Sequence, residues 1–544
     1  MTDTATISVN DFASFAADLR ARVEPLEIEV GDAWWQANLA SSPESEERAG
    51  HAQKEITRLY ADRAAYAQLQ GMADTGMPAD DARQRQLLLH SYAGNQMDDA
   101  VIEEIVDTER AVESRYNSFR PMLRGVPTGD NALRDILRTS LDSEARREAW
   151  EASKEIGREV AGDVLKLVTL RNREARRLGY ADYYTMALAL QEQDKDALLA
   201  LLDTVEAQTN TLWRAYKTGL DAVLAARFKI TPADLRPWHY GDPFFQEAPA
   251  GGVDLDRYFA DKNLEALTAD FFAAIGLDVR DILDRSDLYE RENKSQHAFC
   301  IHVGRFGDVR VLCNCTPSER WMGTMLHEFG HAVYDKFLGN DLPFFLRAPA
   351  HTLTTEAIAM LMGRLSRNAA WLVRYAQVAS DEASVIAQSA EAEAAAQLLI
   401  FARWVLVMAH FERALYENPN QDLNALWWQI VARFQNVLPP DERAAPDWAA
   451  KNHIALAPVY YHNYLMGEMF ASQLLEYLRT HVLPAGSNED DLVSSPLVGD
   501  YLKRNVFAHG ARLPWDELIE AATSEPLNAA HFAAHLVPAA PPTM

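Results

Sequence analysis

The residues best placed to carry out chemistry lie in the stretch MLHEFGHAVYD at positions 325–335. Its apolar residues have helical spacing, and residues four positions apart lie on one face of a helix. His327 and His331 can therefore bind one metal ion together. Glu328 follows the first histidine directly and can face an open coordination position as a general base. Packing requires none of these polar side chains, so the stretch predicts a zinc site with an adjacent base.

A third metal ligand is expected downstream, because a reactive zinc ion usually has three protein ligands and one open position. The segment APAHTLTTEAIAMLMGRL (348–365) offers His351 and Glu356. We predict His351 in a loop, and Glu356 in the first turn of a helix whose N-cap is Thr354. A carboxylate near a helix N-terminus is also favoured by the helix dipole. We therefore prefer Glu356 as the third ligand and keep His351 as the alternative.

The elements that must position these residues are mainly helices. Segments such as 44–70, 103–120 and 143–179 are charged, periodic and poor in β-branched residues, which is typical of helices. The segment HAFCIHVGRFGDVRVLCNC (297–315) differs, because it is rich in Val, Ile, Phe and Cys and is interrupted by GRFGD. It predicts a β-hairpin just before the histidine pair. No repeat or long linker divides the chain, so we expect a single domain over residues 1–544.

The composition restricts the partners of the chain. Its 544 residues carry 52 Lys and Arg against 79 Asp and Glu, a net charge of −27. Such a chain should repel nucleic acid and anionic membrane surfaces. The most apolar stretch, 397–411, is interrupted by Arg403 and is shorter than the ~20 residues of a membrane span. With three cysteines and no recognisable secretory signal, the sequence predicts a cytoplasmic protein without nucleic-acid or membrane partners.

Several segments resemble one family in the same order along the chain. The H-E-x-x-H motif, followed 25 residues after His331 by the Glu356 of TEAIAM, resembles the gluzincin peptidases of the angiotensin-converting-enzyme (peptidyl-dipeptidase A) family and, more distantly, the thimet oligopeptidases. The other matching segments are AWWQANLASSPESEERAG (33–50), LRNREARRLGYADY (170–183) and RLPWDELIEAATSEPL (512–527). The resemblance implies a mostly α, two-lobed helical metallopeptidase with a deep central channel and a small β-hairpin at the active site. It also implies a helical lid at about 1–125, zinc-binding elements within 297–365 and a second catalytic segment at 451–470.

The resemblance assigns roles to residues of this second segment. His453 and Tyr464 correspond to the pair that stabilises the oxyanion of the reaction. Lys451 corresponds to the lysine that holds the C-terminal carboxylate of the substrate, together with Tyr461 or Tyr460. The choice between these two tyrosines stays open, because the chain is one residue longer than the family pattern between His453 and Tyr464.

Two further assignments come from the same resemblance. Gln246, in WHYGDPFFQE, corresponds to a glutamine that binds the substrate carboxylate. His302, in CIHVG, corresponds to a histidine on a strand whose edge holds the extended peptide.

The chain also departs from the family pattern at two places. Met360 stands where the family has an aspartate that hydrogen-bonds a metal-binding histidine, so a different acceptor is required. His462 and Asn463 stand where the family has a chloride-binding arginine, which puts chloride activation in doubt.

Together these features predict a zinc-dependent hydrolase of oligopeptides with one Zn²⁺ per chain. We expect C-terminal dipeptides as products, because a cation at the end of the channel would fix the substrate carboxylate two residues from the cut. One alternative is a thimet-type oligoendopeptidase, which needs no terminal carboxylate. Others are a catalytically inactive peptide-binding relative, against which the intact Glu328 argues, and a metal-free helical scaffold. The oligomeric state and the natural peptides are not fixed by the sequence.

Overall fold

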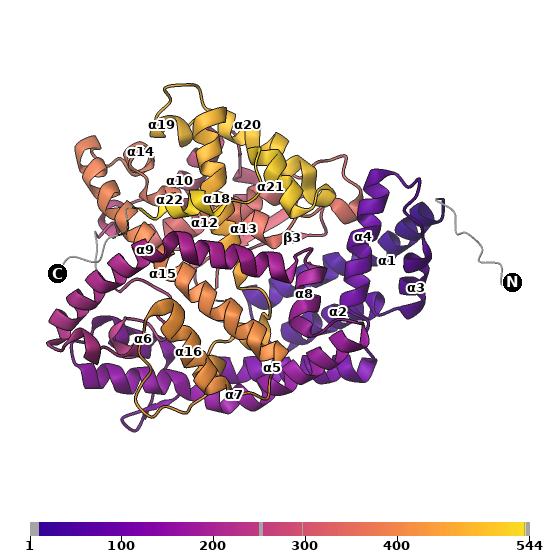
Figure 1. The fold of residues 1–544 in the computed structure, drawn as a ribbon. Coiled ribbons are helices and arrows are strands. Elements are labelled where there is room, and N and C mark those ends of the chain that lie inside the picture. The colour runs from indigo at the N-terminus through magenta and orange to yellow at the C-terminus, as the bar shows by residue number, and fades with distance from the viewer. Residues whose placement is uncertain (1–9, 250–253, 296, 538, 540–544) are drawn as a thin grey trace.

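The computed structural model describes residues 10–249, 254–295, 297–537 and 539. Its described part is built almost wholly of helices, as the sequence predicts, and its strands form two antiparallel two-stranded hairpins. Figure 1 shows the N-terminal helices α1–α4 gathered at one end of the molecule, with β3, α12 and α13 in the upper half beside α18, and α6, α7 and α16 in the lower half.

The N-terminal half consists of long helices and one short hairpin. These elements are α1 (Asn10–Leu39), α2 (Pro43–Tyr60), α3 (Arg63–Gly71), α4 (Ala79–Gly94), α5 (Asp99–Ser118), β1 (Met122–Leu123), β2 (Val126–Pro127), α6 (Asp130–Thr139), α7 (Ser143–Arg177), α8 (Tyr183–Leu190) and α9 (Lys195–Phe228).

The C-terminal half contains the second hairpin and the remaining α-helices. These elements are α10 (Leu264–Ala274), α11 (Arg280–Leu283), β3 (Phe299–Val303), β4 (Asp308–Leu312), α12 (Glu319–Lys336), α13 (Thr352–Gly363), α14 (Ala369–Trp371), α15 (Ser380–Glu417), α16 (Leu423–Gln435), α17 (His453–Leu456), α18 (His462–Tyr477), α19 (Glu489–Leu492), α20 (Pro496–Asn505), α21 (Trp515–Thr523) and α22 (Ala529–His535).

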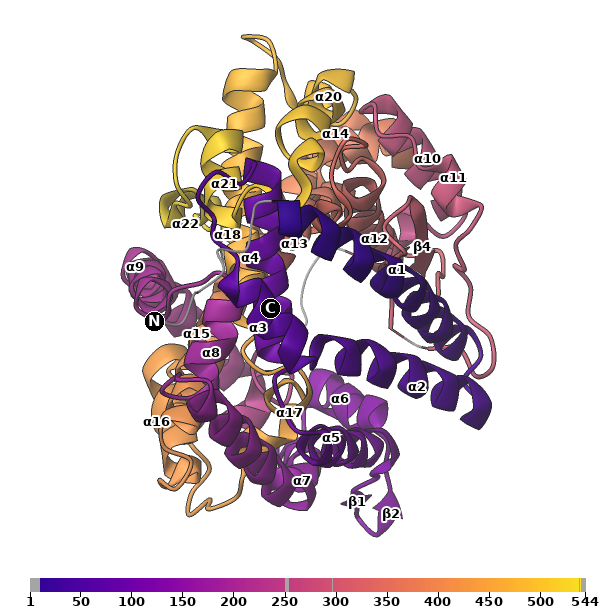
Figure 2. The same cartoon turned by 90° about the vertical axis from the view of Figure 1, so that its right-hand side faces the viewer.

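The predicted lid region has a core of its own. A small apolar cluster joins α1, α3 and α4, and its fully buried members include Val23, Leu69 and Tyr92. Phe344 and Phe345, from the segment between α12 and α13, complete this cluster. The N-terminal helices are therefore packed onto the chain that leads into α13. In Figure 2, α1 and α2 lie next to each other and α1 passes in front of α12 and β4.

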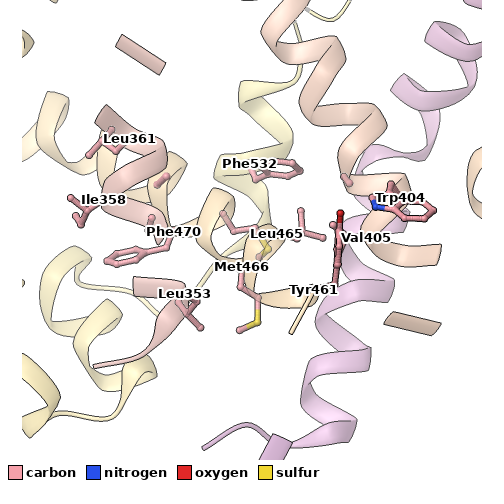
Figure 3. Packing of buried hydrophobic residues seen from close by; sticks show 14 of the residues in the cluster. Leu353, Ile358, Leu361, Trp404, Val405, Tyr461, Leu465, Met466, Phe470 and Phe532 are labelled. Carbon is pink, nitrogen blue, oxygen red and sulfur yellow. The ribbon is translucent and has the colours of Figure 1, made fainter. Parts of the chain in front are cut away.

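The main core surrounds α13, α15 and α18. Figure 3 shows Leu353 and Ile358 of α13 facing Phe470 of α18, with Trp404 and Val405 of α15 on the other side of α18. Among the described helices, α15 is the one long and apolar enough to cross a membrane, and 78% of its most apolar window is buried inside the fold. A core helix has this composition because all its faces meet other helices.

The hairpin of β3 and β4 forms as predicted, with His302 opposite Val309. Its turn contains Gly304 at φ +68° and Gly307 at φ +83°, where a side chain would be strained. The turn is held against α1, because Arg305 donates two 2.7 Å hydrogen bonds to the carboxylate of Glu27. Close to this contact, Trp34 of α1 packs on Phe299 of β3 with ring centroids 4.3 Å apart. The N-terminal helices therefore meet the hairpin beside the predicted site.

Candidate metal centre and active site

Helix α12 carries the histidine pair, and its local sequence explains where it begins. The Ser318 hydroxyl accepts a hydrogen bond from the backbone N–H of Trp321, which caps the helix N-terminus. The helix then runs without interruption to Lys336, so His327 and His331 are one turn apart on the same face. Their ring centroids lie 5.0 Å apart.

Helix α13 begins earlier than the sequence predicts. Its N-cap is His351, whose Nδ1 accepts the backbone N–H of Leu353 at 3.1 Å, and not Thr354. The Thr354 hydroxyl instead donates to the carbonyl of His351 at 2.8 Å, inside the first turn. Glu356 therefore lies in the second turn of the helix and not in the first. The Nδ1 atom of His351 is used in capping. Of the two candidates for the third ligand, Glu356 is therefore the one that faces the histidines of α12.

The two helices approach each other unusually closely where the metal would bind. A Cβ atom at Gly330 would lie only 2.7 Å from the Cα of Ala359, so no larger residue fits between α12 and α13. A Cβ at Gly467 of α18 would similarly lie 3.1 Å from the Cβ of Glu356. Glycine is needed at position 330 because a Cβ there would overlap the backbone of α13, whereas a Cβ at position 467 would make a tight contact with Glu356. This close packing brings Glu356 opposite the histidine pair.

The three predicted ligands form a compact donor set. The ligand atoms of His327, His331 and Glu356 all lie within 4.8 Å of one another. The Oε2 of Glu356 is 3.7 Å from Nε2 of His327 and 3.8 Å from Nε2 of His331. Tetrahedral ligands bound to zinc at about 2.0–2.1 Å would be about 3.3 Å apart. Two imidazoles and a carboxylate at these separations fit a zinc ion with one open position.

Burial prepares this donor set to bind a cation. It lowers the pKa of His327 to about 4 and, together with the neighbouring His327, holds the pKa of His331 well below its usual value. Both imidazoles are therefore neutral near pH 7, which is the form that binds metal. Burial, and then the charge of Glu468, raises the pKa of Glu356 to about 7. A carboxylate that is costly to ionise in a buried place is stabilised by a bound cation.

The donor set opens into a cavity of about 700 Å³. We call this the central cavity; residues of β3, α12, α13 and the start of α18 line it, among them Glu328, Tyr460 and Tyr464. Glu328 itself is buried, and burial, followed by the charge of Glu356, raises its pKa to about 8. A carboxylate whose pKa lies near the working pH can both accept and return a proton.

A hydroxyl group on α13 can serve as the hydrogen-bond acceptor of the metal-binding His331. Nδ1 of His331 lies 2.8 Å from the hydroxyl of Thr355, which can accept its N–H and so leave Nε2 with a free lone pair. The sequence pattern does not indicate an acceptor that would replace the aspartate of the family at Met360. Thr355 precedes Glu356 directly, so the available signal is a hydroxyl beside the third ligand, five residues before the position at which the family pattern has its acceptor.

We expect Thr355→Val to lower zinc affinity by about ten- to hundredfold, as removal of outer-shell partners typically does. Valine keeps the volume of threonine but cannot hold the His331 ring by a hydrogen bond. Zinc affinity can be measured by competition with a chromophoric chelator. Thr324→Val, which removes a hydroxyl that bonds to the carbonyl of Arg320 in its own helix, is the matched control. Equal affinity in the two variants would contradict the role of Thr355.

The three predicted tyrosines pack together, with the Tyr464 ring centroid 5.2 Å from that of Tyr460 and 5.4 Å from that of Tyr461, but only two of them line the central cavity. Tyr460 and Tyr464 line the central cavity, and the Tyr460 hydroxyl lies 3.5 Å from Oε1 of Glu356. Burial, followed by the charge of Glu356, raises the pKa of Tyr464 to about 12, so the phenol keeps its proton. Tyr461 is not among the residues that line the cavity, and its ring packs on Trp404. The sequence left open which of Tyr460 and Tyr461 accompanies Lys451.

Tyr461 is the tyrosine beside the predicted carboxylate-binding residues. The ammonium of Lys451 lies 5.4 Å from the centroid of the Tyr461 ring and donates a 2.9 Å hydrogen bond to Oε1 of Gln246. Phe244 and Trp404 also face this ammonium, at 5.7 and 5.6 Å from their ring centroids. Burial lowers the pKa of Lys451 to about 8. We call Lys451, Gln246 and Tyr461 the lysine cluster.

His453 packs against the lysine cluster, and Tyr461 of that cluster in turn packs on Tyr464 with ring centroids 5.4 Å apart. The His453 ring packs edge-on against Tyr461 with centroids 5.0 Å apart, and its Nδ1 lies 2.8 Å from Oδ1 of Asn452. It is not among the residues that line the central cavity. Burial, and then the charge of Lys451, lowers its pKa to about 4.

His302 lines the central cavity from β3, but both of its ring nitrogens face protein groups. Nε2 accepts the backbone N–H of Gly307 at 2.9 Å, and Nδ1 lies 3.7 Å from the carboxylate of Asp335. The far side of β4 is joined by a parallel bridge to Asp287, so the edge open to a peptide is that of β3. The neighbouring Cys300 also lines the cavity and is a free thiol.

Comparison with known protein families gives two matches. Residues 8–224 match the family model described as angiotensin-converting enzyme, and residues 284–538 match the model of peptidase family M3. The matched segments do not overlap, and the second contains the three predicted ligands and Glu328. No curated protein matched the chain. Both families consist of zinc metallopeptidases, and the donor set described above fits that chemistry; the chain is therefore a gluzincin metallopeptidase related to both angiotensin-converting enzyme and peptidase family M3.

Proposed function

We propose that this zinc peptidase releases C-terminal dipeptides from oligopeptides. The observation that carries the proposal is the lysine cluster, which holds a half-buried ammonium among three aromatic rings, one of which packs on Tyr464 of the central cavity. A lysine in such a place can bind a carboxylate by a charge-assisted hydrogen bond. Gln246, which already accepts from this ammonium, can turn its amide N–H toward the same carboxylate.

The reacting groups are proposed to act from the central cavity. When bound by His327, His331 and Glu356, a zinc ion supplies Lewis-acid polarisation and lowers the pKa of a coordinated water to about 7. Glu328 takes the proton of the attacking water on its carboxylate and delivers it to the nitrogen of the leaving amine. Tyr464 donates its O–H to the oxygen that gains negative charge in the transition state.

Two details of the sequence prediction change in this proposal. Tyr460 joins Tyr464 as a candidate O–H donor, because both line the central cavity. His453, which the resemblance paired with Tyr464 at the oxyanion, is instead proposed to act beside the lysine cluster, because its ring contacts Tyr461. Its neutral imidazole can there hydrogen-bond the end of the substrate.

We expect C-terminal amidation of a peptide to lower kcat/KM by at least tenfold. Amidation removes the anion, and a charge-assisted bond to a buried lysine contributes about 1.5–3 kcal/mol. The measurement is mass spectrometry of the products, with initial rates for matched free-acid and amide peptides. The wild-type products from free acids should be dipeptides. KM for free acids should also rise above about pH 8, because the Lys451 pKa of about 8 means that the ammonium loses its charge there.

Lys451→Met tests the same idea from the protein side. It should lower activity on free-acid peptides and remove most of their advantage over amides, whereas Lys166→Met, at a surface lysine paired with Glu104, should change neither. Equal cleavage of acids and amides at internal bonds by the wild-type protein would refute the dipeptidase proposal. It would support the endopeptidase alternative without changing the proposed zinc chemistry.

The endopeptidase alternative rests on a specific observation. The M3 match covers residues 284–538, which include the metal ligands, Glu328, both cavity tyrosines and Lys451, but not Gln246. The inactive peptide-binding alternative has less support, because Glu328 is present and lines the cavity. We further propose a cytoplasmic location, which is supported by the three free cysteines in the described residues.

A further inference from the structure

The backbone immediately before the active-site tyrosines is strained. Val459 has φ +56°, in the left-handed region, although it is β-branched and fully buried. This conformation is a genuine outlier for such a side chain and persists only where the surroundings hold it. Tyr460 follows Val459 directly, and Tyr461 and Tyr464 lie within the next five residues. The backbone therefore turns at Val459 immediately before it enters the segment that carries these tyrosines.

Two side chains from distant helices hold both backbone polar groups of Val459. Glu412, buried on α15, accepts its N–H through Oε1 at 2.7 Å. Gln191, the C-cap residue of α8, donates its amide N–H to the Val459 carbonyl at 3.1 Å. A buried N–H and C=O that lie outside regular structure need such partners. Here both partners come from residues that are distant in the sequence.

Gln191 is itself fixed by a chain of hydrogen bonds that leads into α18. Its Oε1 accepts from Asn463 at 3.1 Å, and Oδ1 of Asn463 accepts from Gln193 at 3.0 Å. Oε1 of Gln193 lies 2.6 Å from Nε2 of His462, which can donate to it. Gln191 and Gln193 reach the same helix start because Glu192 between them is in the left-handed region, at φ +58°. A fully satisfied buried network of this kind makes one conformation specific.

Burial of the Glu412 carboxyl group costs free energy unless the group has a hydrogen-bond partner. Burial raises its pKa to about 8, and its carboxylate accepts the backbone N–H of Val459. It lies on α15 and is not among the residues that line the central cavity. Its hydrogen bond to Val459 is the contact that joins it to the segment of the active-site tyrosines.

We infer that Glu412 is a positioning residue for peptide hydrolysis, which together with Gln191 holds Val459 in its left-handed conformation and so aims Tyr460, Tyr461 and Tyr464 at their places. The inference rests on the proposed roles of these tyrosines. It requires that Glu412 acts as a hydrogen-bond acceptor rather than as a charge. It also requires that its importance depends on the strain at residue 459.

The first test compares two substitutions of matched size. Glu412→Met removes the acceptor and should lower kcat at least tenfold without changing zinc content, at a temperature well below unfolding. Glu412→Gln keeps an acceptor oxygen and should stay within about threefold of the wild type. If both variants lose activity equally, or if Glu412→Met keeps the wild-type kcat, the inference is overturned.

A double-mutant cycle with Val459→Gly separates positioning from general stability. Glycine adopts positive φ without strain, so residue 459 then no longer needs to be held. Glu412→Met should cost at least tenfold in kcat on the valine background but no more than about threefold on the glycine background. An equal loss on both backgrounds would mean that Glu412 only stabilises the fold, and would overturn the inference. Should Glu412→Met not fold, Gln191→Leu replaces it in the same cycle.

Hydrogen exchange tests the inference independently of activity. In Glu412→Met the backbone amide of residue 459 should exchange at least tenfold faster than in the wild type, whereas Glu412→Gln should leave it protected. Absence of peptide hydrolysis in the wild-type protein would refute the proposed function, and the exchange result would still decide whether Glu412 holds Val459. Unchanged exchange in Glu412→Met would overturn the inference even if hydrolysis is observed.

Discussion

Glu328→Gln is expected to lower kcat/KM for every peptide substrate by about 10²–10⁴, the usual contribution of a general base, while zinc content stays unchanged. Glutamine has the size of glutamate but cannot accept a proton from the attacking water. Glu328 lines the central cavity and is not one of the three residues whose ligand atoms converge. Its loss should therefore remove the chemistry and leave the metal site intact.

The measurement combines initial rates on a fluorogenic peptide with elemental analysis of the same sample. Glu103→Gln, which makes the same charge change at an exposed position of α5, is the matched control and should keep full activity. Near-normal turnover in Glu328→Gln would refute the mechanism. The candidate general base would then be Asp335, the other carboxylate on α12 that lines the cavity.

Glu356→Ala is expected to remove activity together with the metal. It deletes one of three converging ligands, so zinc affinity should fall by more than the ten- to hundredfold that follows loss of an outer-shell partner. Zinc titration against a competing chelator gives the affinity, and circular dichroism checks that the helices remain. The two variants thus differ in kind, because Glu328→Gln keeps zinc and Glu356→Ala loses it.

His351→Ala distinguishes Glu356 from the alternative ligand. The imidazole of His351 caps α13 by accepting the N–H of Leu353, so its loss should cost about 1 kcal/mol of stability and leave zinc affinity unchanged. One tightly bound zinc in Glu356→Ala, with loss of zinc in His351→Ala, would reverse the assignment of the third ligand.

The difference between prediction and structure at α13 has a simple physical cause. Ser, Thr, Asp and Asn are the usual N-cap residues, so the sequence favoured Thr354 as the cap. A histidine can do the same through an unprotonated Nδ1, and burial holds the pKa of His351 at about 4, which keeps the ring neutral. The helix therefore starts three residues before its predicted start, and Glu356 moves from the first turn to the second without changing the helix it faces.

The tyrosines show where spacing along the chain stops being informative. Tyr460 and Tyr461 are adjacent, and the resemblance did not distinguish them because the chain is one residue longer there. In the structure the Tyr460 hydroxyl lies 3.5 Å from Glu356, the Tyr461 ring lies 5.4 Å from the ammonium of Lys451, and the residue before them, Val459, has a left-handed backbone. A single backbone dihedral angle held by Glu412 and Gln191 is not visible in any sequence pattern.

By itself, the sequence determined the helical character of the protein, the β-hairpin before α12 and the pairing of His327 with His331. These features depend on contacts between residues a few positions apart, and helical or strand periodicity fixes such contacts locally. The tertiary structure decided the partner of His331, the place of His453 and the way in which the tyrosines are aimed. These depend on α8, α13, α15 and α18 meeting in space, and Glu412 and Val459 are 47 residues apart. Such contacts follow from how complete helices pack, which no local pattern encodes.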